Sequence, residues 1–210
     1  MIETVVAEDS FIAQSFLTNL IGADKEFHIA GVYGDAFKAE EKCLEGGIDL
    51  AVLDVMTEGN HSGIAAGRRI RQSSTGTKVV IVTSLVDGEI LARAKQGAAD
   101  SLWYKDHGGA DLMDVIRRTM SGEHIFPDNA PSIALGDMFS GDITPRQMQL
   151  LRYFVMGYTY DEIAEKLGIT ERGVRWYMNE LLLKGGFKNR HEMLSAILQN
   201  KLIVTTLLDS

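Results

Sequence analysis

Hydrophobic and polar positions follow two different periods along the first 125 residues. Short, continuous apolar runs at residues 4–7, 50–53 and 79–82 are typical of strands that are buried on both faces. Between these runs, apolar residues recur at helical spacing, as they do at residues 11–21. This alternation predicts a parallel sheet that is covered by helices on both faces.

The pattern predicts five strands and five helices in this part of the chain. The strands are expected at residues 4–7, 27–33, 49–53, 78–83 and 101–104, and the helices at 11–21, 36–44, 63–72, 87–96 and 111–121. Right-handed crossovers leave few possible topologies, and the flavodoxin-like strand order 2-1-3-4-5 is favoured.

From residue 143 onward the pattern is helical throughout. Four helices are expected, with N-caps at Thr144, Thr159, Thr170 and Asn189. The second and third helices are short and meet at Gly168, which is typical of a helix-turn-helix. We therefore expect an α/β domain over residues 1–125, a linker over 126–142 and an all-α domain over 143–210. Apolar residues in the linker indicate that part of it packs on a domain.

Charge is distributed unevenly between these parts. The chain has a formal net charge of −8, with −8 in residues 1–128, −2 in residues 129–142 and +2 in residues 143–210. The overall charge argues against a protein whose whole surface is basic and binds nucleic acid. An acidic N-terminal part and a mildly basic C-terminal part instead indicate two domains with different partners.

No apolar run approaches the roughly 20 residues that a membrane-spanning helix needs. The N-terminus carries Glu3, Glu8 and Asp9 and has no basic cluster, so a signal peptide is not expected. Cys43 is the single cysteine, which excludes an intrachain disulfide and fits a reducing compartment. We expect a cytoplasmic protein with no membrane contact.

Five polar residues fall at the carboxyl ends of the predicted strands. Glu8 and Asp9 follow the first strand, Asp54 the third, Thr83 closes the fourth and Lys105 the fifth. Open α/β sheets bind ligands at this edge. Taken alone, each residue has an ordinary structural interpretation as a loop, cap or surface residue. Together they predict a site where three carboxylates repel one another unless a hard cation such as Mg²⁺ is bound.

The chemistry of such a site is phosphoryl transfer. A carboxylate can form an acyl phosphate, which makes Asp54 the predicted nucleophile. The cation and Lys105 would neutralise the incoming phosphoryl group. Thr83 would donate a hydrogen bond to a phosphoryl oxygen and shift when that group arrives.

These stretches resemble the receiver domain of response regulators. The resemblance rests on Val5-Val6-Ala7-Glu8-Asp9, Leu53-Asp54-Val55, Val80-Ile81-Val82-Thr83-Ser84 and Gly97-Ala98-Ala99-Asp100 with Lys105-Asp106, the last of which is similar to the NarL/FixJ branch. It covers about residues 1–125. It implies that a histidine kinase supplies the phosphoryl group. It also implies that Glu8, Asp9, Asp54 and the backbone carbonyl of Met56 hold Mg²⁺, and that Thr83, Ser84 and Lys105 bind the phosphoryl group.

The chain departs from the receiver pattern at several positions. Leu102 stands where many receivers carry an aromatic switch residue, and we expect Trp103 and Tyr104 to point elsewhere because neighbouring strand residues alternate faces. Glu58 stands where a proline is common. Met56 and Leu85 are apolar at positions that often place the hydrolytic water, which predicts slow loss of phosphate.

The third predicted helix of the C-terminal domain is expected to enter the major groove of DNA. The outward residues expected to contact DNA are Arg172, Arg175, Trp176 and Asn179, with backbone contacts from Lys184, Lys188 and Arg190. Arg175 would contact either a guanine edge or a phosphate. A helical domain that binds protein is the alternative from spacing alone.

Residues 143–203 resemble the LuxR-type helix-turn-helix domain. The resemblance rests on Ile143-Thr144-Pro145-Arg146, Glu162-Ile163-Ala164, Leu167-Gly168-Ile169, Val174-Arg175 and Asn189-Arg190. In that family the last helix commonly dimerises, which implies a homodimer contact through Met193, Ile197 and Leu198.

Several residues of this domain depart from the LuxR-type pattern. Gly173 lies inside the recognition helix, where it costs about 1 kcal/mol relative to alanine. Trp176 would either meet a thymine methyl group or pack internally. Tyr160 and Asp161 replace residues that are often polar and basic, which removes expected phosphate contacts.

The sequence thus predicts a two-component response regulator that binds double-stranded DNA. It would not be an enzyme beyond catalysing its own phosphotransfer and dephosphorylation. The alternatives are a phosphorylation-independent receiver and a receiver whose helical domain binds protein. A phosphohydrolase is disfavoured because Met56 stands where a general acid-base aspartate is needed.

Overall fold

The computed structural model describes residues 1–106 and 111–203 of the 210-residue chain. The described residues form two compact units, of which the first ends at Ala130 and the main body of the second begins at Pro131. Residues 204–210, with which the predicted helical domain ends, lie outside the described residues.

The first unit is built on one parallel sheet. Its strands are β1 (Ile2–Ala7), β2 (Phe27–Tyr33), β3 (Leu50–Asp54), β4 (Lys78–Thr83) and β5 (Ser101–Tyr104). Their order is β2-β1-β3-β4-β5, and each pair of neighbours is parallel. The predicted strand order is confirmed, and it makes β3 the neighbour of both β1 and β4.

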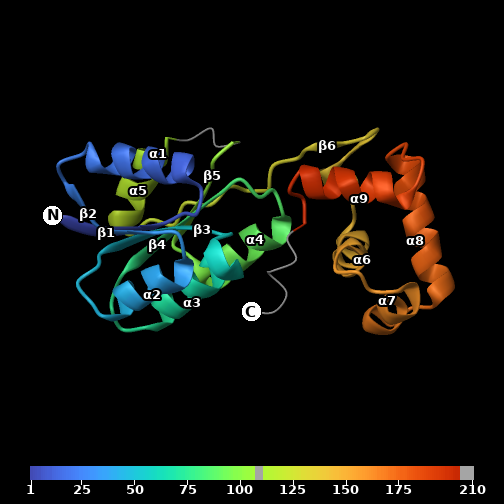
Figure 1. Ribbon diagram of the computed structural model, residues 1–210, viewed down its shortest axis with the longest axis horizontal. Helices are drawn as coiled ribbons and strands as arrows, with labels where there is room; N and C mark the ends of the chain where they lie inside the picture. The colour runs from blue at the N-terminus through green and yellow to red at the C-terminus, as the bar shows by residue number, and fades with distance from the viewer. Residues whose placement is uncertain (107–110, 204–210) are drawn as a thin grey trace. The chain divides into compact units, whose positions relative to one another are not determined.

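Helices cover both faces of this sheet (Figure 1). On one face lie α1 (Phe11–Gly22) and α5 (Leu112–Met120), and on the other lie α2 (Ala36–Leu44), α3 (Gly63–Gln72) and α4 (Gly88–Arg93). Every residue of β3 is buried, as expected of a strand that is covered on both sides. The α1 and α5 face encloses a core to which Val6, Val52 and Ile116 belong.

The helix predicted at residues 87–96 is shorter than expected. α4 ends at Arg93 and continues as a π-helical turn, η2 (Ala94–Ala98), in which Gln96 and Gly97 leave the helical backbone. Gly97 has a φ of 108°, which residues with a Cβ rarely adopt. The expected stop at this glycine is therefore seen, together with a wider final turn.

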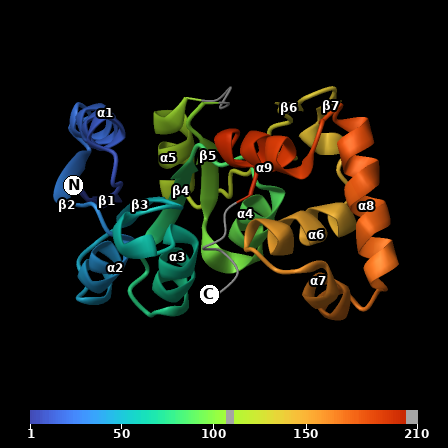
Figure 2. The same ribbon diagram turned by 45° about the vertical axis from the view of Figure 1, so that its right-hand side comes forward.

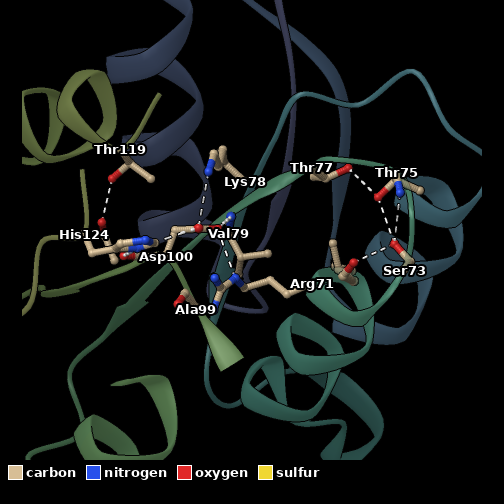
Figure 3. A network of polar contacts seen from close by, with 12 residues as sticks. Arg71, Ser73, Thr75, Thr77, Lys78, Val79, Ala99, Asp100, Thr119 and His124 are labelled. Atoms are coloured by element: carbon tan, nitrogen blue, oxygen red, sulfur yellow. Dashed lines mark hydrogen bonds and ion pairs between the residues drawn. The ribbon is translucent and has the colours of Figure 1, made fainter. Parts of the chain in front are cut away.

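The amino-terminal edge of the sheet holds a buried carboxylate, Asp100, just before β5 (Figure 3). Its Oδ2 accepts the backbone N–H of Val79 at 2.9 Å. Arg71 Nε lies 3.3 Å from Oδ2, and Lys78 Nζ lies 3.5 Å from Oδ1. His124 Nδ1 is 3.0 Å from the Asp100 carbonyl oxygen. This network ties α3, β4 and β5 together and surrounds the one carboxylate with two cationic side chains.

The second unit is helical (Figure 2). Its helices are α6 (Pro145–Val155), α7 (Tyr160–Leu167), α8 (Glu171–Lys184) and α9 (Arg190–Gln199). All four predicted N-caps accept a backbone N–H with their side chains, and Thr144 and Thr159 form full capping boxes. Gly168 ends α7 in the left-handed conformation with a φ of 62°. The predicted helix-turn-helix is thus formed by α7 and α8.

The segment that the sequence assigns to a linker contains a β-hairpin. β6 (Ala134–Leu135) pairs with β7 (Met138–Phe139), and a short 3-10 helix, η3 (Ser140–Asp142), follows. Leu135 and Met138 are buried in the core of the second unit. Asp137 N–H donates to the Gly185 carbonyl at 3.0 Å, so the hairpin lies against the end of α8 (Figure 2). Strands of two residues are too short to produce a readable alternation.

Candidate functional site

Three carboxylates converge at the carboxyl-terminal edge of the sheet. Asp54 is the last residue of β3, and Glu8 and Asp9 follow the neighbouring strand β1. One oxygen from each of the three residues lies within 4.8 Å of the other two. Glu8 is buried, Asp54 is nearly so and Asp9 is exposed. The cluster can hold a divalent metal, as sequence analysis predicted.

The chain after β1 fixes the position of Glu8. The N–H of Ser10 donates to Glu8 Oε1 at 3.0 Å, and Gln14 Nε2 donates to the Glu8 carbonyl at 2.9 Å. Both donors belong to the start of α1. The Glu8 side chain is therefore held at the sheet edge, while Asp9 next to it remains open to solvent.

Lys105 brings a positive charge to this cluster from the end of β5. Its Nζ lies 3.0 Å from Asp54 Oδ2 and also makes a short ion pair with Glu8. Burial lowers the pKa of Lys105, but the attraction of Asp54 and Glu8 outweighs it and raises that pKa above its ordinary value. Lys105 is therefore charged at neutral pH.

The pKa of Asp54 is also raised above its ordinary value, and burial is the main cause. Burial raises its pKa to about 6, and the nearby Glu8 carboxylate adds to this rise. Lys105 and the N–H of Val55, which donates to Oδ1 at 2.7 Å, lower it. A carboxylate that is held in this way is ionised at neutral pH and is poorly solvated, which favours bond formation with an electrophile or binding of a cation.

Thr83 and Ser84 lie beside this cluster at the end of β4. Thr83 is fully buried and Ser84 is half-buried. The Thr83 carbonyl accepts the N–H of Lys105 at 2.8 Å. A backbone hydrogen bond therefore links the predicted switch residue to the predicted phosphoryl-binding lysine. The structure thus brings together the five residues that the sequence singled out at the strand ends.

The segment from the end of β3 to the start of α3 holds two residues, Thr57 and Gly63, that the sequence did not single out. Thr57 Oγ1 accepts the N–H of Ala36 at 3.0 Å and donates to the His61 carbonyl at 2.7 Å, which fastens the loop to the start of α2. A Cβ on Gly63 would lie 1.9 Å from the Asp54 carbonyl oxygen. Asp54 can therefore take this position only because residue 63 is a glycine. No pattern along the chain predicts such a close approach.

The expectation about β5 is correct for one aromatic residue and wrong for the other. Trp103 packs against the core on the α1 and α5 face, opposite to Leu102. Tyr104 is two residues beyond Leu102 and is also buried, so strand alternation puts it on the Leu102 side of the sheet. Tyr104 is also the partner of Thr83 in the register between β4 and β5.

The predicted DNA-contacting residues lie on the surface of the second unit. Arg172, Arg175, Trp176 and Asn179 of α8 are all exposed, and so are Lys184, Lys188 and Arg190. Trp176 is 58% exposed, and its ring meets that of Tyr177 edge-on at 4.9 Å. This exposure favours an outward role for Trp176 over internal packing.

The prediction for the dimer contact is wrong for two of its three residues. Met193 and Ile197 are buried in the core of the second unit, where they pack with residues of the other helices. Such side chains are not available to a second copy of the chain. Leu198 is 49% exposed and is the one member of the set that lies at the surface.

Among the described residues, no helix is long and apolar enough to cross a membrane.

Comparisons with known proteins agree with this division of the chain. Residues 4–117 match the family described as the response regulator receiver domain, and residues 142–196 match bacterial regulatory proteins of the luxR family. The oxygen regulatory protein NreC of Staphylococcus aureus is 22% identical over 212 residues, which cover 95% of this chain and 98% of NreC.

Two solved structures show the same fold. RcsB of Salmonella enterica serovar Typhimurium, solved bound to a promoter with a phosphomimetic, is similar with a TM-score of 0.62 and 17% identity over 93% of this chain and 97% of RcsB. A LuxR-family response regulator from Staphylococcus aureus has a TM-score of 0.53 and 21% identity over 57% of this chain and 99% of its own.

Proposed function

Since the chain belongs to the response regulators of the NarL/FixJ family, with a receiver domain and a LuxR-type domain, we propose that Asp54 accepts a phosphoryl group from a histidine kinase and that α8 binds double-stranded DNA. The protein would act in the cytoplasm, where its DNA is. The family is one of transcription regulators, and the catalysis that we propose is limited to transfer and loss of its own phosphoryl group.

One observation supports the phosphoacceptor role above the others. Three carboxylates cluster at the edge of a parallel sheet, and Lys105 pairs with two of them, the nearly buried Asp54 and the buried Glu8. The donor set fits Mg²⁺, which prefers carboxylate and carbonyl oxygens. Glu8, Asp9, Asp54 and the Met56 carbonyl would hold the ion, which would neutralise charge on the phosphoryl group.

The remaining site residues then have separate roles. Lys105 binds a phosphoryl oxygen and gives up part of its contact with Asp54. Thr83 and Ser84 hydrogen-bond the phosphoryl group, and the bond between Lys105 and the Thr83 carbonyl couples their movements. Phosphorylation would favour a minor conformation through these contacts, and a homodimer would bind DNA.

Incubation with acetyl phosphate and Mg²⁺, followed by intact-mass measurement, tests the phosphoacceptor role. We expect the mass to rise by one phosphoryl group in the wild type and not in Asp54→Asn. A phosphorylated Asp54→Asn protein, or an unmodified wild type, would contradict the proposal. The apolar side chains of Met56 and Leu85 predict slow loss of this group, so a lifetime of seconds in Mg²⁺ would contradict that part.

A gel shift with duplex DNA over a range of salt concentrations tests the second role. DNA binding through phosphates predicts affinity that falls linearly with salt on logarithmic axes. If the helical domain binds protein instead, no shift is expected at any salt concentration.

A further inference from the structure

Side chains from three helices meet at Tyr160, the first residue of α7. The guanidinium carbon of Arg175, from α8, lies 5.2 Å from the centre of the Tyr160 ring, and that of Arg190, from α9, lies 5.3 Å from it. Arg190 Nη1 also donates a hydrogen bond to the Tyr160 hydroxyl at 2.9 Å. One aromatic side chain therefore contacts two cations that come from different helices.

Tyr160 is held firmly enough to serve as a platform. Its ring lies 6.5 Å from that of Phe154 and packs against the core of the second unit. It starts α7 directly after the Thr159 capping box, which fixes the backbone at this point. The two arginines are long and exposed, so without such a contact they would sample many rotamers.

The arrangement brings two positive charges to one ring, and one carboxylate, Glu171, partly offsets them. Glu171 pairs with Arg175 one helical turn before it. Attraction to the ring face is worth only about 0.5–1 kcal/mol for each exposed cation. Two guanidinium groups that are held at one ring can each donate hydrogen bonds to an anion, and a phosphodiester backbone presents anions in a regular row.

We propose that Tyr160 is a positioning residue that holds Arg175 and Arg190 as a pair for the phosphodiester backbone of DNA. This inference rests on the proposed DNA-binding function. It also assigns Arg175 to phosphate rather than to a guanine edge, because the side chain is drawn toward α7 and Glu171. Contacts with base edges are then left to Arg172, Trp176 and Asn179 on the exposed face of α8.

Replacement of Tyr160 by leucine in the full-length protein tests the ring. The probe is a random-sequence duplex, and the dissociation constant is measured by fluorescence anisotropy over a series of salt concentrations. We expect Tyr160→Leu to weaken binding roughly tenfold and to reduce the slope of log affinity against log salt by about 1. Tyr160→Phe keeps the ring and should remain within about threefold of the wild type, with an unchanged slope.

The chain offers a matched control in Tyr158. Its ring carries Lys166 at 4.6 Å and packs against the same core, but neither arginine contacts it. Tyr158→Leu should therefore leave the salt slope unchanged. Thermal unfolding of each variant shows whether the domain is folded, and a Tyr158→Leu slope that falls as much as that of Tyr160→Leu would overturn the assignment.

A double-mutant cycle separates positioning from general destabilisation. In the Arg175→Ala/Arg190→Ala background, Tyr160→Leu should cause no further loss of affinity, since no cation is left to hold. An undiminished effect there would overturn the proposal, and so would Tyr160→Phe if it behaved like Tyr160→Leu.

Selection of binding sites from a random duplex pool tests the assignment of Arg175. Arg175→Ala should select the same sequences as the wild type, while its salt slope falls by about 1. Lost preference at one guanine with an unchanged slope would overturn this part. If the wild type binds no duplex at all, the proposed function itself fails, whereas wild-type binding that Tyr160→Leu does not alter rejects this inference alone.

Discussion

The two edges of the parallel sheet each hold buried carboxylates, and they balance them in opposite ways. At the amino-terminal edge, Asp100 is one carboxylate with two cationic side chains, Arg71 and Lys78, and a backbone N–H around it (Figure 3). At the carboxyl-terminal edge, the acidic cluster has three carboxylates, and one lysine, Lys105, pairs with Glu8 and Asp54.

This difference separates a structural site from a functional one. A buried carboxylate whose charge and hydrogen-bonding capacity are satisfied holds elements together. A cluster with more negative than positive charge retains capacity for a cation and for an electrophile. Burial does not distinguish the two sites, because Asp100 and Asp54 are almost equally buried. The balance of charge around each carboxylate does. The predictions below test this distinction.

The largest effect on stability is expected from Asp100→Ala. This change leaves the charges of Arg71 and Lys78 and the N–H of Val79 without their buried acceptor, and removing one partner of such a group costs roughly 3–5 kcal/mol. Urea unfolding measures the loss. Protein that remains folded should still accept a phosphoryl group, because the acidic cluster lies at the other edge.

Asp100→Asn serves as the control for this change. It keeps an oxygen acceptor for the Val79 N–H and loses only the charge, so it should cost less than Asp100→Ala. Equal losses for the two variants would show that the ion pairs, and not the satisfied N–H, carry the stabilisation.

Asp54→Asn is expected to have the opposite sign. The pKa of Asp54 is raised from 3.8 to about 6, so the folded protein binds this proton more tightly than the unfolded chain does. The resulting penalty is absent below about pH 4 and complete above about pH 6, where it reaches about 3 kcal/mol. Without metal at neutral pH, Asp54→Asn should therefore unfold at higher urea concentration than the wild type.

Two measurements sharpen this prediction. The advantage of Asp54→Asn should disappear when unfolding is repeated near pH 4, where the wild-type carboxyl is protonated. Mg²⁺ should stabilise the wild type more than the variant, because an ion that binds only the folded state adds stability. An advantage that is the same at both pH values would refute the charge argument.

The sequence was sufficient for the parts of the site that depend on strand ends. In a parallel sheet, residues that close neighbouring strands must lie at one edge, so Glu8, Asp54 and Lys105 could be brought together from their positions in the chain. The helix caps were equally predictable, since Thr144 and Thr159 act on residues three positions away.

Features that depend on contacts between distant side chains were not predictable. Tyr160 was interpreted as a lost phosphate contact, and its arginine partners come from 15 and 30 residues further along the chain. Met193 and Ile197 have helical spacing that fits a surface stripe and a core equally well. The β6–β7 hairpin was missed because two-residue strands have no period.

Gly63→Ala should have an intermediate effect that is local to the acidic cluster. The new Cβ would overlap the Asp54 carbonyl oxygen, which is backbone and cannot rotate away. Overpacking of this kind costs roughly 1–3 kcal/mol. It should also slow phosphorylation by acetyl phosphate, whereas Gly22→Ala, where a Cβ would make only an ordinary van der Waals contact, should leave the phosphorylation rate unchanged.

The smallest effect is expected from Lys78→Met, and it completes the comparison of the two edges. Lys78 has a side chain that is 34% exposed, and Asp100 keeps Arg71 and the Val79 N–H when it is lost. The cost should be at most about 1 kcal/mol.

The same substitution at Lys105 removes the one cation that the described residues bring to the acidic cluster. It should raise the pKa of Asp54 further above its ordinary value, which shifts the pH dependence of stability upward. If Lys78→Met and Lys105→Met had equal effects on stability at neutral pH, charge balance would not distinguish the two edges.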